Sequence, residues 1–493
     1  MTTTFRKTQQ PGSIRPKPER KALYKLMGCG VALEAGFLGM IGLGNLTDRA
    51  GWYVGLTWGL FLLFGLSCWL LIKQAGKAGQ REWLFISLFF AALFRLTTLF
   101  AAPTLSTDQF RYTWEGRLVT QGVSPYRYAP DDPALLKYRS EIWPLVQQRE
   151  TASPYPPLAQ LIGAGEYLLF GESLLGPKIA AIVFDGLTCL ALLWLLGIYG
   201  LDKRRIILYA WCPLPIIEFG QSGHNDAPML FLLLMAIGLA ERRKPTLSAL
   251  ALGLACLAKF TPIFGLPLFL VVWHFARSGK GGQAGWNWRT ALSFPTWAYP
   301  FLTGLVIVGG YLPFLFMGQG AIGSILEYTG SWRDNEGLVY GILADWTMPL
   351  VVKGLSIAVV GGTILLLSFH PTLAISLSLP RRLMLLFGVV LLVASTVHPW
   401  YLSWVLVLLP LVYLKESAFN AWDNGWLLFA ALVQLVYLAY AGDGSPYIWV
   451  KPLEYWPLYL FIGWSLLKSK RSASTNSIIN KLKENQVKND SIN

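Results

Sequence analysis

The sequence predicts an all-α fold: a polytopic transmembrane helical bundle of about 12–14 spans, with a large extracytoplasmic loop after the third span that carries interfacial helices. Of the 493 residues, 54% are hydrophobic and only 14% are charged. Apolar runs of about 20 residues, the length that crosses the hydrocarbon core, recur along most of the chain. The 21 Trp and 21 Tyr suit both membrane interfaces and sugar-stacking surfaces. The chain is therefore expected to be built around the bilayer.

The apolar segments are expected to cross or enter the membrane. They lie near 24–45, 52–73, 83–101, 178–200, 206–219, 226–240, 246–258, 261–276, 290–316, 349–369, 382–397, 400–414, 425–441 and 453–467. Several are short for about 30 Å of hydrocarbon, so some are expected to be re-entrant. The arrangement with both ends inside requires residues 155–170 to form an interfacial helix and not a span.

Basic residues indicate the orientation, because Lys and Arg cluster in the connections of one side. The net charge of +14 is thus a topology signal, and no nucleic-acid partner is expected. We expect a basic cytoplasmic N-terminus (1–22), a transmembrane domain (23–468) whose extracytoplasmic loop spans 102–177, and a disordered cytoplasmic tail (469–493). The first span lacks a signal-peptide cleavage pattern and is expected to remain, in the inner (plasma) membrane. The five cysteines lie in apolar segments and predict no disulfide.

The head of the large loop carries the strongest functional signal. Asp108 follows a long apolar segment and is a candidate general base that takes a proton from a sugar hydroxyl. The alternative is an Asp that caps a helix start, because Ser106-Thr107-Asp108 suits an N-cap. Glu115 follows two helical turns later, so it can share a face with Asp108 and Arg111 and contact sugar or acceptor.

Arginines and aromatic residues follow in the same loop. Arg111 and Arg117, together with Arg127, are candidates for binding a donor phosphate, since guanidinium groups form bidentate hydrogen bonds with phosphate. Pairing with Glu115 and Asp108, or with lipid headgroups, is the alternative. The aromatic residues are candidates for stacking on sugar, with interfacial anchoring as the alternative; they are Tyr112, Trp114, Tyr126 and Tyr128.

Three later motifs also carry polar groups at span ends. His224, Asn225 and Asp226 form a polar island that is predicted to position sugar or phosphate; an ordinary turn with Asp226 capping the next helix is the alternative. Lys259 interrupts an apolar stretch and is expected to contact a lipid phosphate, or to snorkel to the interface. The third motif, His398-Pro399-Trp400-Tyr401, opens another span and is expected to contact phosphate or sugar, or to start an aromatic-belt helix.

The predicted topology places these motifs, together with Arg333-Asp334, on the side of the large loop, and their convergence on one face favours a common site. Several motifs are missing. The sequence contains no phosphate-binding P-loop, no dinucleotide glycine fingerprint and no HExxH zinc motif. The first-loop acid lacks an Asp-x-Asp form, since Asp108-Gln109-Phe110 stands there. No cofactor is therefore expected, and metal independence is predicted.

The motifs together resemble the bacterial polyprenyl-phosphate-mannose-dependent mannosyltransferases, which belong to the GT-C class of integral membrane glycosyltransferases. The resemblance runs from about residue 83 to about residue 415, in matching order. Its motifs are the 108–117 loop, Ser124-Pro125-Tyr126, Tyr155-Pro156-Pro157, residues 222–226, residues 258–262 and residues 398–401. It implies a polyprenyl-phosphate sugar donor, inversion at the anomeric carbon and an acid at the acceptor hydroxyl, the place that Asp108 occupies. It also implies lipid-phosphate contacts from basic residues, for which Lys259, Arg111 and His398 are the candidates.

The sequence therefore predicts a membrane glycosyltransferase that moves a hexose, mannose by the resemblance, to a glycolipid or glycan acceptor on the extracytoplasmic face. One alternative is a lipid-linked sugar flippase or transporter, which would need a polar path across the membrane. Arg95 and Asp185 are the main intramembrane exceptions to the one-sided distribution, and a buried pair between them would leave no such path. The other alternative is an oligosaccharide polymerase or ligase. Only the product of the reaction would distinguish it from an enzyme that transfers a hexose.

Overall fold

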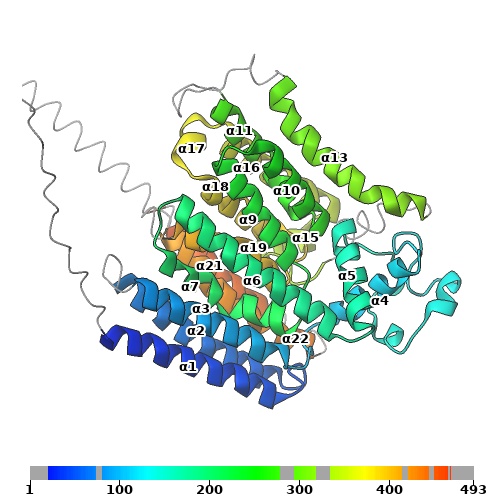
Figure 1. Cartoon of the computed structure of the whole chain (residues 1–493), viewed down its shortest axis with the longest axis horizontal. Coiled ribbons are helices and arrows are strands. Elements are labelled where there is room, and N and C mark those ends of the chain that lie inside the picture. Colours follow the sequence, from blue (N-terminus) through cyan, green and yellow to red (C-terminus); the bar gives the residue numbers. More distant parts are fainter. Residues whose placement is uncertain are drawn as a thin grey trace, which may run out of the picture.

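The computed structural model describes residues 20–73, 80–277, 294–317, 333–413, 420–442, 449–464 and 467. Within these residues every regular element is helical, and the only β pairing is an isolated bridge between Asp334 and Thr396 (Figure 1). The all-α prediction is confirmed. The predictions for the basic N-terminus and the C-terminal tail fall outside the described residues, except that residues 20–22 already belong to the first helix.

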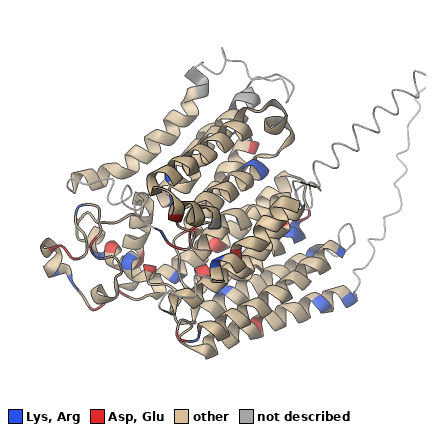
Figure 2. Ribbon diagram, turned by 180° about the vertical axis from the view of Figure 1, so that it is seen from behind, with Lys and Arg blue, Asp and Glu red and all other residues tan. Residues whose placement is uncertain are grey.

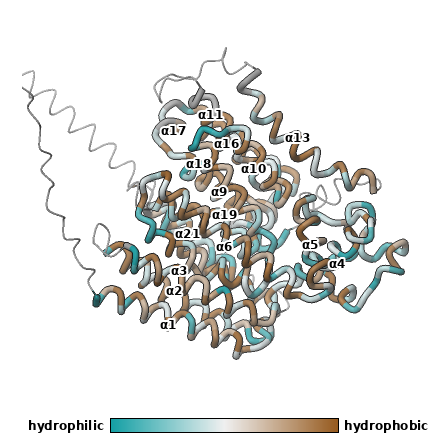
Figure 3. Tube along the Cα trace, in the orientation of Figure 1, coloured by the Kyte–Doolittle hydropathy of each residue, from teal (hydrophilic) through white to brown (hydrophobic). Residues whose placement is uncertain are grey.

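Seven helical segments among the described residues are long and apolar enough to cross a membrane. They are α1 (Arg20–Leu43), α2 (Ala50–Lys73), α3 (Gln80–Leu99), α6 (Leu175–Ile198), α13 (Phe294–Phe316), α16 (Pro349–Phe369) and the run formed by α21 (Asn420–Leu432), η8 (Val433–Leu435) and α22 (Val436–Tyr440). Each overlaps a predicted span. Figure 3 shows these helices as largely hydrophobic tubes, with the hydrophilic colour gathered in connections and in the loop that carries α4 and α5. The chain is a multi-helical membrane protein.

Shorter apolar helices occupy most of the other predicted spans. They are α9 (Ala227–Glu241), α10 (Pro245–Ala258), η5 (Thr261–Gly265) with α11 (Leu266–Arg277), and the run of η6 (Pro399–Leu402), α19 (Ser403–Leu406) and α20 (Leu409–Val412). Residues 449–464 are helical as well. The remaining short helices are α15 (Leu338–Trp346), α17 (Pro371–Ser376) and α18 (Leu379–Val393). The total number of membrane crossings stays a prediction.

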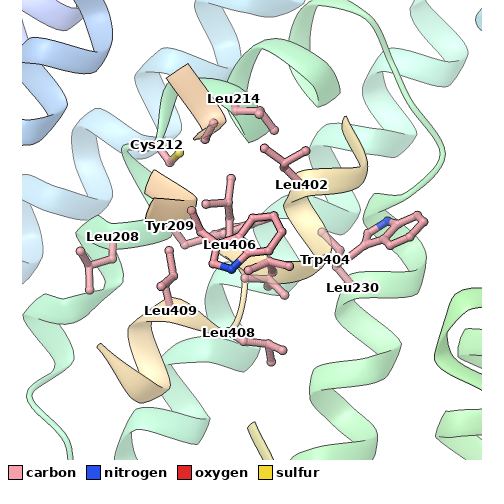
Figure 4. Close-up of a cluster of buried hydrophobic side chains, with 14 of the residues drawn as sticks. Leu208, Tyr209, Cys212, Leu214, Leu230, Leu402, Trp404, Leu406, Leu408 and Leu409 are labelled. Atoms are coloured by element: carbon pink, nitrogen blue, oxygen red, sulfur yellow. The ribbon is translucent and has the colours of Figure 1, made fainter. Parts of the chain in front are cut away.

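Two predicted spans consist only of short helical pieces. The segment near 206–219 is divided among η3 (Lys203–Ile206), α7 (Ile207–Ala210), α8 (Pro213–Pro215) and the π-helical η4 (Ile216–Gln221). Proline lacks an N–H and breaks the helical ladder, which explains the interruptions at Pro213 and at Pro410. Both broken segments are almost fully buried. In Figure 4 their side chains, among them Tyr209 and Leu406, point into one hydrophobic cluster.

The large loop folds as a separate layer at one end of the long helices (Figure 1). It contains α4 (Asp108–Thr120), η1 (Pro133–Tyr138), η2 (Trp143–Leu145) and α5 (Pro157–Phe170). A Cβ added to Gly116 of α4 would lie 2.2 Å from the Gly163 carbonyl oxygen of α5, so these glycines allow the two helices to touch through their backbones. With 14 residues, α5 is about 21 Å long, too short for an untilted crossing.

A buried ion pair accounts for two charges inside the helical layer. Arg95 Nε lies 2.6 Å from an Asp185 carboxylate oxygen, and the Tyr209 hydroxyl donates to the same carboxylate. Two carbonyl oxygens, of Ala91 and Ala210, accept from the Arg95 guanidinium. The expected buried pair between Arg95 and Asp185 is thus confirmed. Both charges of this pair are therefore satisfied by protein groups.

Candidate functional site

Asp108 is held at the start of α4 by hydrogen bonds to the chain segment that leads into it. The Lys178 ammonium donates to the carbonyls of Leu99 and Ala101 at the end of α3. The Gln221 amide donates to the next carbonyl, that of Ala102. Gln109 donates to the carbonyls of Pro103 and Ser106. These contacts fix residues 99–107 and therefore the point at which α4 begins.

The Asp108 carboxylate is not used as a helix cap. Thr107 is the N-cap residue and makes no side-chain capping bond. The Asp108 side chain is 33% exposed, and it accepts a hydrogen bond of 3.3 Å from the Tyr112 hydroxyl one turn later. Burial by the surrounding protein raises the pKa of Asp108, while His398, Lys259 and the Tyr112 hydrogen bond oppose the rise. The carboxylate is thus accessible and partly desolvated, as a general base requires.

His224 lies directly beneath this carboxylate, between two acids. Its Nδ1 is 3.8 Å from Asp108 Oδ2, and its Nε2 is 3.4 Å from Glu218 Oε2. The His224 side chain is fully buried, and burial, followed by the charges of Lys259 and His398, lowers its pKa. Glu218 comes from the π-helical turn η4 and accepts a hydrogen bond from the Tyr437 hydroxyl. Such π-helical turns occur frequently at functional sites.

Two histidines and a tryptophan form a stack across the site. Both histidine rings stack on the Trp400 ring. The centre of the His224 ring lies 3.6 Å from the centre of the Trp400 ring, and the centre of the His398 ring lies 4.4 Å from it. His398 Nδ1 is 3.1 Å from the Tyr440 hydroxyl and 3.4 Å from Asp334 Oδ2. Burial lowers the pKa of His398, although Asp334 and Asp108 favour its charged form. Both imidazoles therefore favour the neutral form.

The backbone bridge explains why Asp334 reaches His398. The amide of Asp334 donates to the Ser395 carbonyl, and the amide of Val397 donates to the Asp334 carbonyl. This pairing brings a segment near residue 334 alongside the one that leads into η6. The Tyr440 hydroxyl, from α22, also donates to Asp334. The site is consequently assembled from segments that are far apart in the sequence.

Lys259 and Asp226 form the second charged group of the site. The Lys259 ammonium is 2.6 Å from Asp226 Oδ2, and the Trp404 indole N–H donates to Asp226 Oδ1 at 2.7 Å. The ammonium also lies 4.7 Å from the centre of the Tyr401 ring, a cation–π arrangement. Asp226 stands at the N-cap of α9 but makes no capping bond. Its carboxylate instead pairs with Lys259. An ammonium group has three N–H donors, so two remain beside this contact.

The structure therefore brings Asp108, His224, Asp226, Lys259, His398, Trp400 and Tyr401 into one cluster, with Asn225 and Tyr112 beside it. In Figure 2 residues of both charge signs gather in this region, between the loop layer and the helices. Their convergence agrees with the arrangement expected from the sequence.

Arg111 and Glu115 follow the alternative of mutual pairing. Arg111 Nε is 2.7 Å from Glu115 Oε1, and its other nitrogens donate to the carbonyls of Gln148 and Thr151. The second Glu115 oxygen accepts from Ser153 and Gln160, each at 2.6 Å. These contacts tie α4 to the end of the loop and to α5. The Arg111 side chain is 5% exposed, which leaves little of its guanidinium for a phosphate.

Three further candidates lie apart from the cluster. Arg117 pairs with Glu172 at the end of α5. Trp114 is fully buried in the small core of the loop, with Leu118, Leu135 and Val146. Tyr126 is also buried; its hydroxyl donates to the Tyr155 carbonyl and its ring packs 5.0 Å from Phe314. Arg117 and Tyr126 bind neighbouring protein through their polar groups, whereas the Trp114 ring is packed in the loop core and its indole N–H has no hydrogen-bond partner.

Several residues at the site were missed by sequence reasoning. Glu218 interrupts the apolar run Ile216-Ile217-Glu218-Phe219, and an acid in such a run is a signal that could have been used. Tyr440, Trp404 and Lys178 gave no local signal, since aromatic and basic residues at span ends usually anchor a helix at the interface. Among the described residues, no three His, Cys, Asp or Glu side chains form a group suited to a metal ion, and metal independence stays a prediction.

A model of the family "α-(1→6)-mannopyranosyltransferase, N-terminal domain" matches residues 29–277, just over half of the 493 residues. Similar curated proteins include a probable α-(1→6)-mannopyranosyltransferase of Mycolicibacterium smegmatis, 22% identical over 64% of this chain and 63% of the relative. Another is α-(1→6)-mannopyranosyltransferase B of Corynebacterium glutamicum, 24% identical over 63% of this chain and 56% of the relative.

α-(1→6)-Mannopyranosyltransferase A of Mycobacterium tuberculosis is 24% identical over 73% of this chain and 70% of that protein. The alignments with the Mycolicibacterium and Corynebacterium relatives thus span less than two thirds of those proteins. The matched family region contains α4, α5, the polar island and Lys259, while His398 and Trp400 lie beyond it. On the strength of the family match, the chain belongs to the α-(1→6)-mannopyranosyltransferase family.

Proposed function

We propose that the chain is a membrane mannosyltransferase that moves mannose from a polyprenyl-phosphate carrier to a hydroxyl group of a glycan or glycolipid, on the extracytoplasmic face of the inner membrane. The names of the relatives support mannosyl transfer. The observation that carries the proposal is the placement of Asp108, an accessible carboxylate, in one cluster with the charged Lys259 and the imidazole of His398. An acid and basic groups at the edge of apolar helices suit an anionic lipid donor.

The proposed reaction is a single displacement. The acceptor hydroxyl oxygen forms a bond to the anomeric carbon, and the bond from that carbon to the phosphate oxygen breaks. Asp108 receives the hydroxyl proton, and the polyprenyl phosphate leaves with the bonding electron pair. Because attack and departure occur on opposite faces, the anomeric configuration is inverted. General base catalysis of this kind contributes about 10²–10⁴ in rate.

The basic groups have the role of stabilising the leaving phosphate. Lys259 has free N–H donors beside its bond to Asp226, and it is 17% exposed. His398 is 15% exposed at the same cluster. Charges and donors that are already in place cost little reorganisation when negative charge develops, so their effect on the transition state is large. His224, held by Trp400 between Asp108 and Glu218, would keep the general base in position.

The test compares purified wild-type protein with Asp108→Asn and Asp131→Asn in an assay of radiolabelled polyprenyl-phosphate mannose with a panel of mannoside and glycolipid acceptors. Asp131 is an acid of the same loop that is 48% exposed and only loosely paired with Arg149. We expect transfer by wild type and Asp131→Asn, and a loss of about 10²–10⁴ for Asp108→Asn with unchanged thermal stability.

Two outcomes would contradict the proposal at different points. Near-wild-type transfer by Asp108→Asn would remove the proposed base. If wild type transferred mannose to no acceptor but bound the lipid saturably, a flippase or another donor sugar would be favoured. A product that carries a whole oligosaccharide would instead indicate a polymerase or ligase. A chelator in the same assay tests the predicted metal independence.

A further inference from the structure

The turn between η4 and α9 brings His224 back over Glu218. The helix η4 ends at Gln221, and Gly223 has a φ of +70°. Glycine adopts this left-handed conformation without a steric cost. The chain reverses there, and the His224 amide donates a hydrogen bond of 3.1 Å to the Glu218 carbonyl. The backbone itself therefore holds the two side chains as neighbours.

The imidazole of His224 lies between two carboxyl groups. Both of its ring nitrogens are buried and have no hydrogen-bond partner within the described residues, which costs about 1–3 kcal/mol for each such atom. The acids on either side are close: Glu218 Oε2 is 3.4 Å from Nε2, and Asp108 Oδ2 is 3.8 Å from Nδ1. Hydrogen bonds at unliganded active sites are often long and shorten when substrates bind. The ring is thus placed to link Glu218 to Asp108.

Glu218 is an acid without a cation. Its side chain is fully buried, and it contacts the His224 ring and the Tyr437 hydroxyl, which lies 3.0 and 3.2 Å from the two carboxyl oxygens. No lysine or arginine of the described chain pairs with it. An ionised carboxylate that is buried without a cation is strongly disfavoured, so such a group takes up a proton. A protonated carboxyl group has an O–H to donate, and His224 Nε2 is the acceptor next to it.

Asp108, on the other side of the ring, is an acid of the opposite kind. Its side chain is 33% exposed, and the charge of Lys259 favours its charged form. A carboxylate in that form only accepts hydrogen bonds. A neutral imidazole carries one N–H, so it satisfies both acids in one way only: Nε2 accepts from Glu218, and Nδ1–H points to Asp108.

We propose that Glu218 is a positioning residue for the general base: as a neutral acid it donates to Nε2 of His224 and so places the ring proton on Nδ1, directed at the Asp108 carboxylate. This inference rests on the proposed function. The N–H group favours the charged form of Asp108, the form that takes the proton of the acceptor hydroxyl. With the proton on Nε2, a lone pair would face Asp108 and would favour its protonated form, which cannot act as a base.

Other titratable groups face these three residues from several elements. They are Tyr437, Tyr53 and Asp226 around Glu218, Lys259 and His398 around His224, and Tyr112, Tyr155, Arg111, Lys259 and His398 around Asp108. Lys259 and Arg111 are held by acids of their own, Asp226 and Glu115. A substitution at Glu218 leaves those pairs intact, so a change in the pH dependence of such a variant reports on the imidazole.

The first measurement locates the proton directly and needs no activity. Protein labelled with nitrogen-15 at histidine is purified in detergent at pH 7–8, and the nitrogen spectrum distinguishes Nδ1–H from Nε2–H. The chain has four histidines, and His224→Gln identifies the signals of His224 by their loss. We expect the proton of His224 on Nδ1 in wild type. A proton on Nε2 would overturn the inference, even if the Glu218 variants fail to fold.

The second measurement is the pH profile of kcat/KM for mannosyl transfer to an alkyl α-mannoside. It compares wild type, Glu218→Gln, Glu218→Leu and the control Glu241→Leu. The amide of Glu218→Gln still donates to Nε2, so its profile should match wild type. Glu218→Leu removes the donor, and we expect the acid limb to move to higher pH by about 0.5–1 unit. Glu241 also accepts from a tyrosine, Tyr199, but lies at the other end of α9, so Glu241→Leu should keep the wild-type limb.

Each outcome bears on either the inference or the proposed function. If Glu218→Gln loses as much activity as Glu218→Leu, Glu218 acts as an anion and the inference is overturned. A profile of Glu218→Leu that is lower at every pH, with an unmoved acid limb, would show that Glu218 only packs the site. If wild type transfers mannose to no acceptor, the proposed function fails, and the nitrogen spectrum alone then supports or overturns the placement of the proton.

Discussion

The Lys259 ammonium lies 2.6 Å from the Asp226 carboxylate, and Asp226 is fully buried. Removing one partner of a buried ion pair leaves an uncompensated charge, which costs about 3–5 kcal/mol, whereas removing both charges is often nearly neutral. We expect Lys259→Met to lower the free energy of unfolding by an amount in that range. The double variant Asp226→Asn, Lys259→Met should recover most of it, as measured by thermal or chemical unfolding in detergent.

The same set of single and double variants distinguishes a structural contribution of Lys259 from a catalytic one. If Lys259 also contacts the leaving phosphate, the double variant should regain stability while its kcat for mannosyl transfer stays low. Recovery of both stability and kcat would show that the ion pair only holds α9 and α10 together. Additive effects of the two single substitutions on unfolding would contradict the close pair itself.

His224 should make the stability of the protein depend on pH. Burial lowers its pKa, so below its ordinary value of about 6.5 the unfolded chain binds a proton that the folded protein does not. Stability therefore rises with pH in that window and is lost as the pH falls. We expect the midpoint of thermal unfolding to drop on acidification from pH 7 to pH 5. The variant His224→Gln should show a smaller drop, and an equal drop would assign the effect to other groups, such as His398.

The long helices could be predicted from the sequence because each is an unbroken apolar run. Segment 206–221 could not be predicted as it is, since a run that is buried inside protein on all sides has the same composition as one that faces lipid. Its prolines indicated a break, but the π-helical register that turns Glu218 toward His224 arises from packing with other helices. The breaks within the segment near 399–412, which was predicted as one span near 400–414, were not predicted for the same reason.

The site shows a similar division. Asp108, His224, Asp226, Lys259 and His398 could be selected because ionisable residues stand out in apolar surroundings. Their mutual contacts could not be predicted from the sequence, since they join positions as far apart as residues 108, 226 and 398. Arg111 and Trp114 were selected from the same motif as candidates for binding phosphate and sugar. The structure instead places both in contacts that hold the loop together.

The rate of transfer should fall on the acid side at a higher pH than an ordinary aspartate would give. Burial raises the pKa of Asp108 above its usual value of about 3.9, and the base works only in its charged form. The Tyr112 hydroxyl favours that form through its hydrogen bond. We therefore expect Tyr112→Phe to move the acid limb of the kcat/KM profile to still higher pH. A shift toward lower pH, or none, would contradict the assignment of the limb to Asp108.

Gly116 should be indispensable for docking α4 onto α5. A Cβ at this position would lie 2.2 Å from the Gly163 carbonyl oxygen, closer than any real contact, and the obstacle is backbone, which cannot rotate away. Separating the helices would strain the Arg111–Glu115–Gln160 network and displace Asp108, which begins the same helix. We expect Gly116→Ala to cost about 1–3 kcal/mol of stability and to lower kcat, measured by unfolding and by mannosyl transfer.

Gly165→Ala is the matched control, since nothing lies within 4 Å of its added Cβ; it should be neutral or stabilising by up to about 1 kcal/mol. Equal behaviour of the two variants would mean that α4 and α5 do not touch through their glycines.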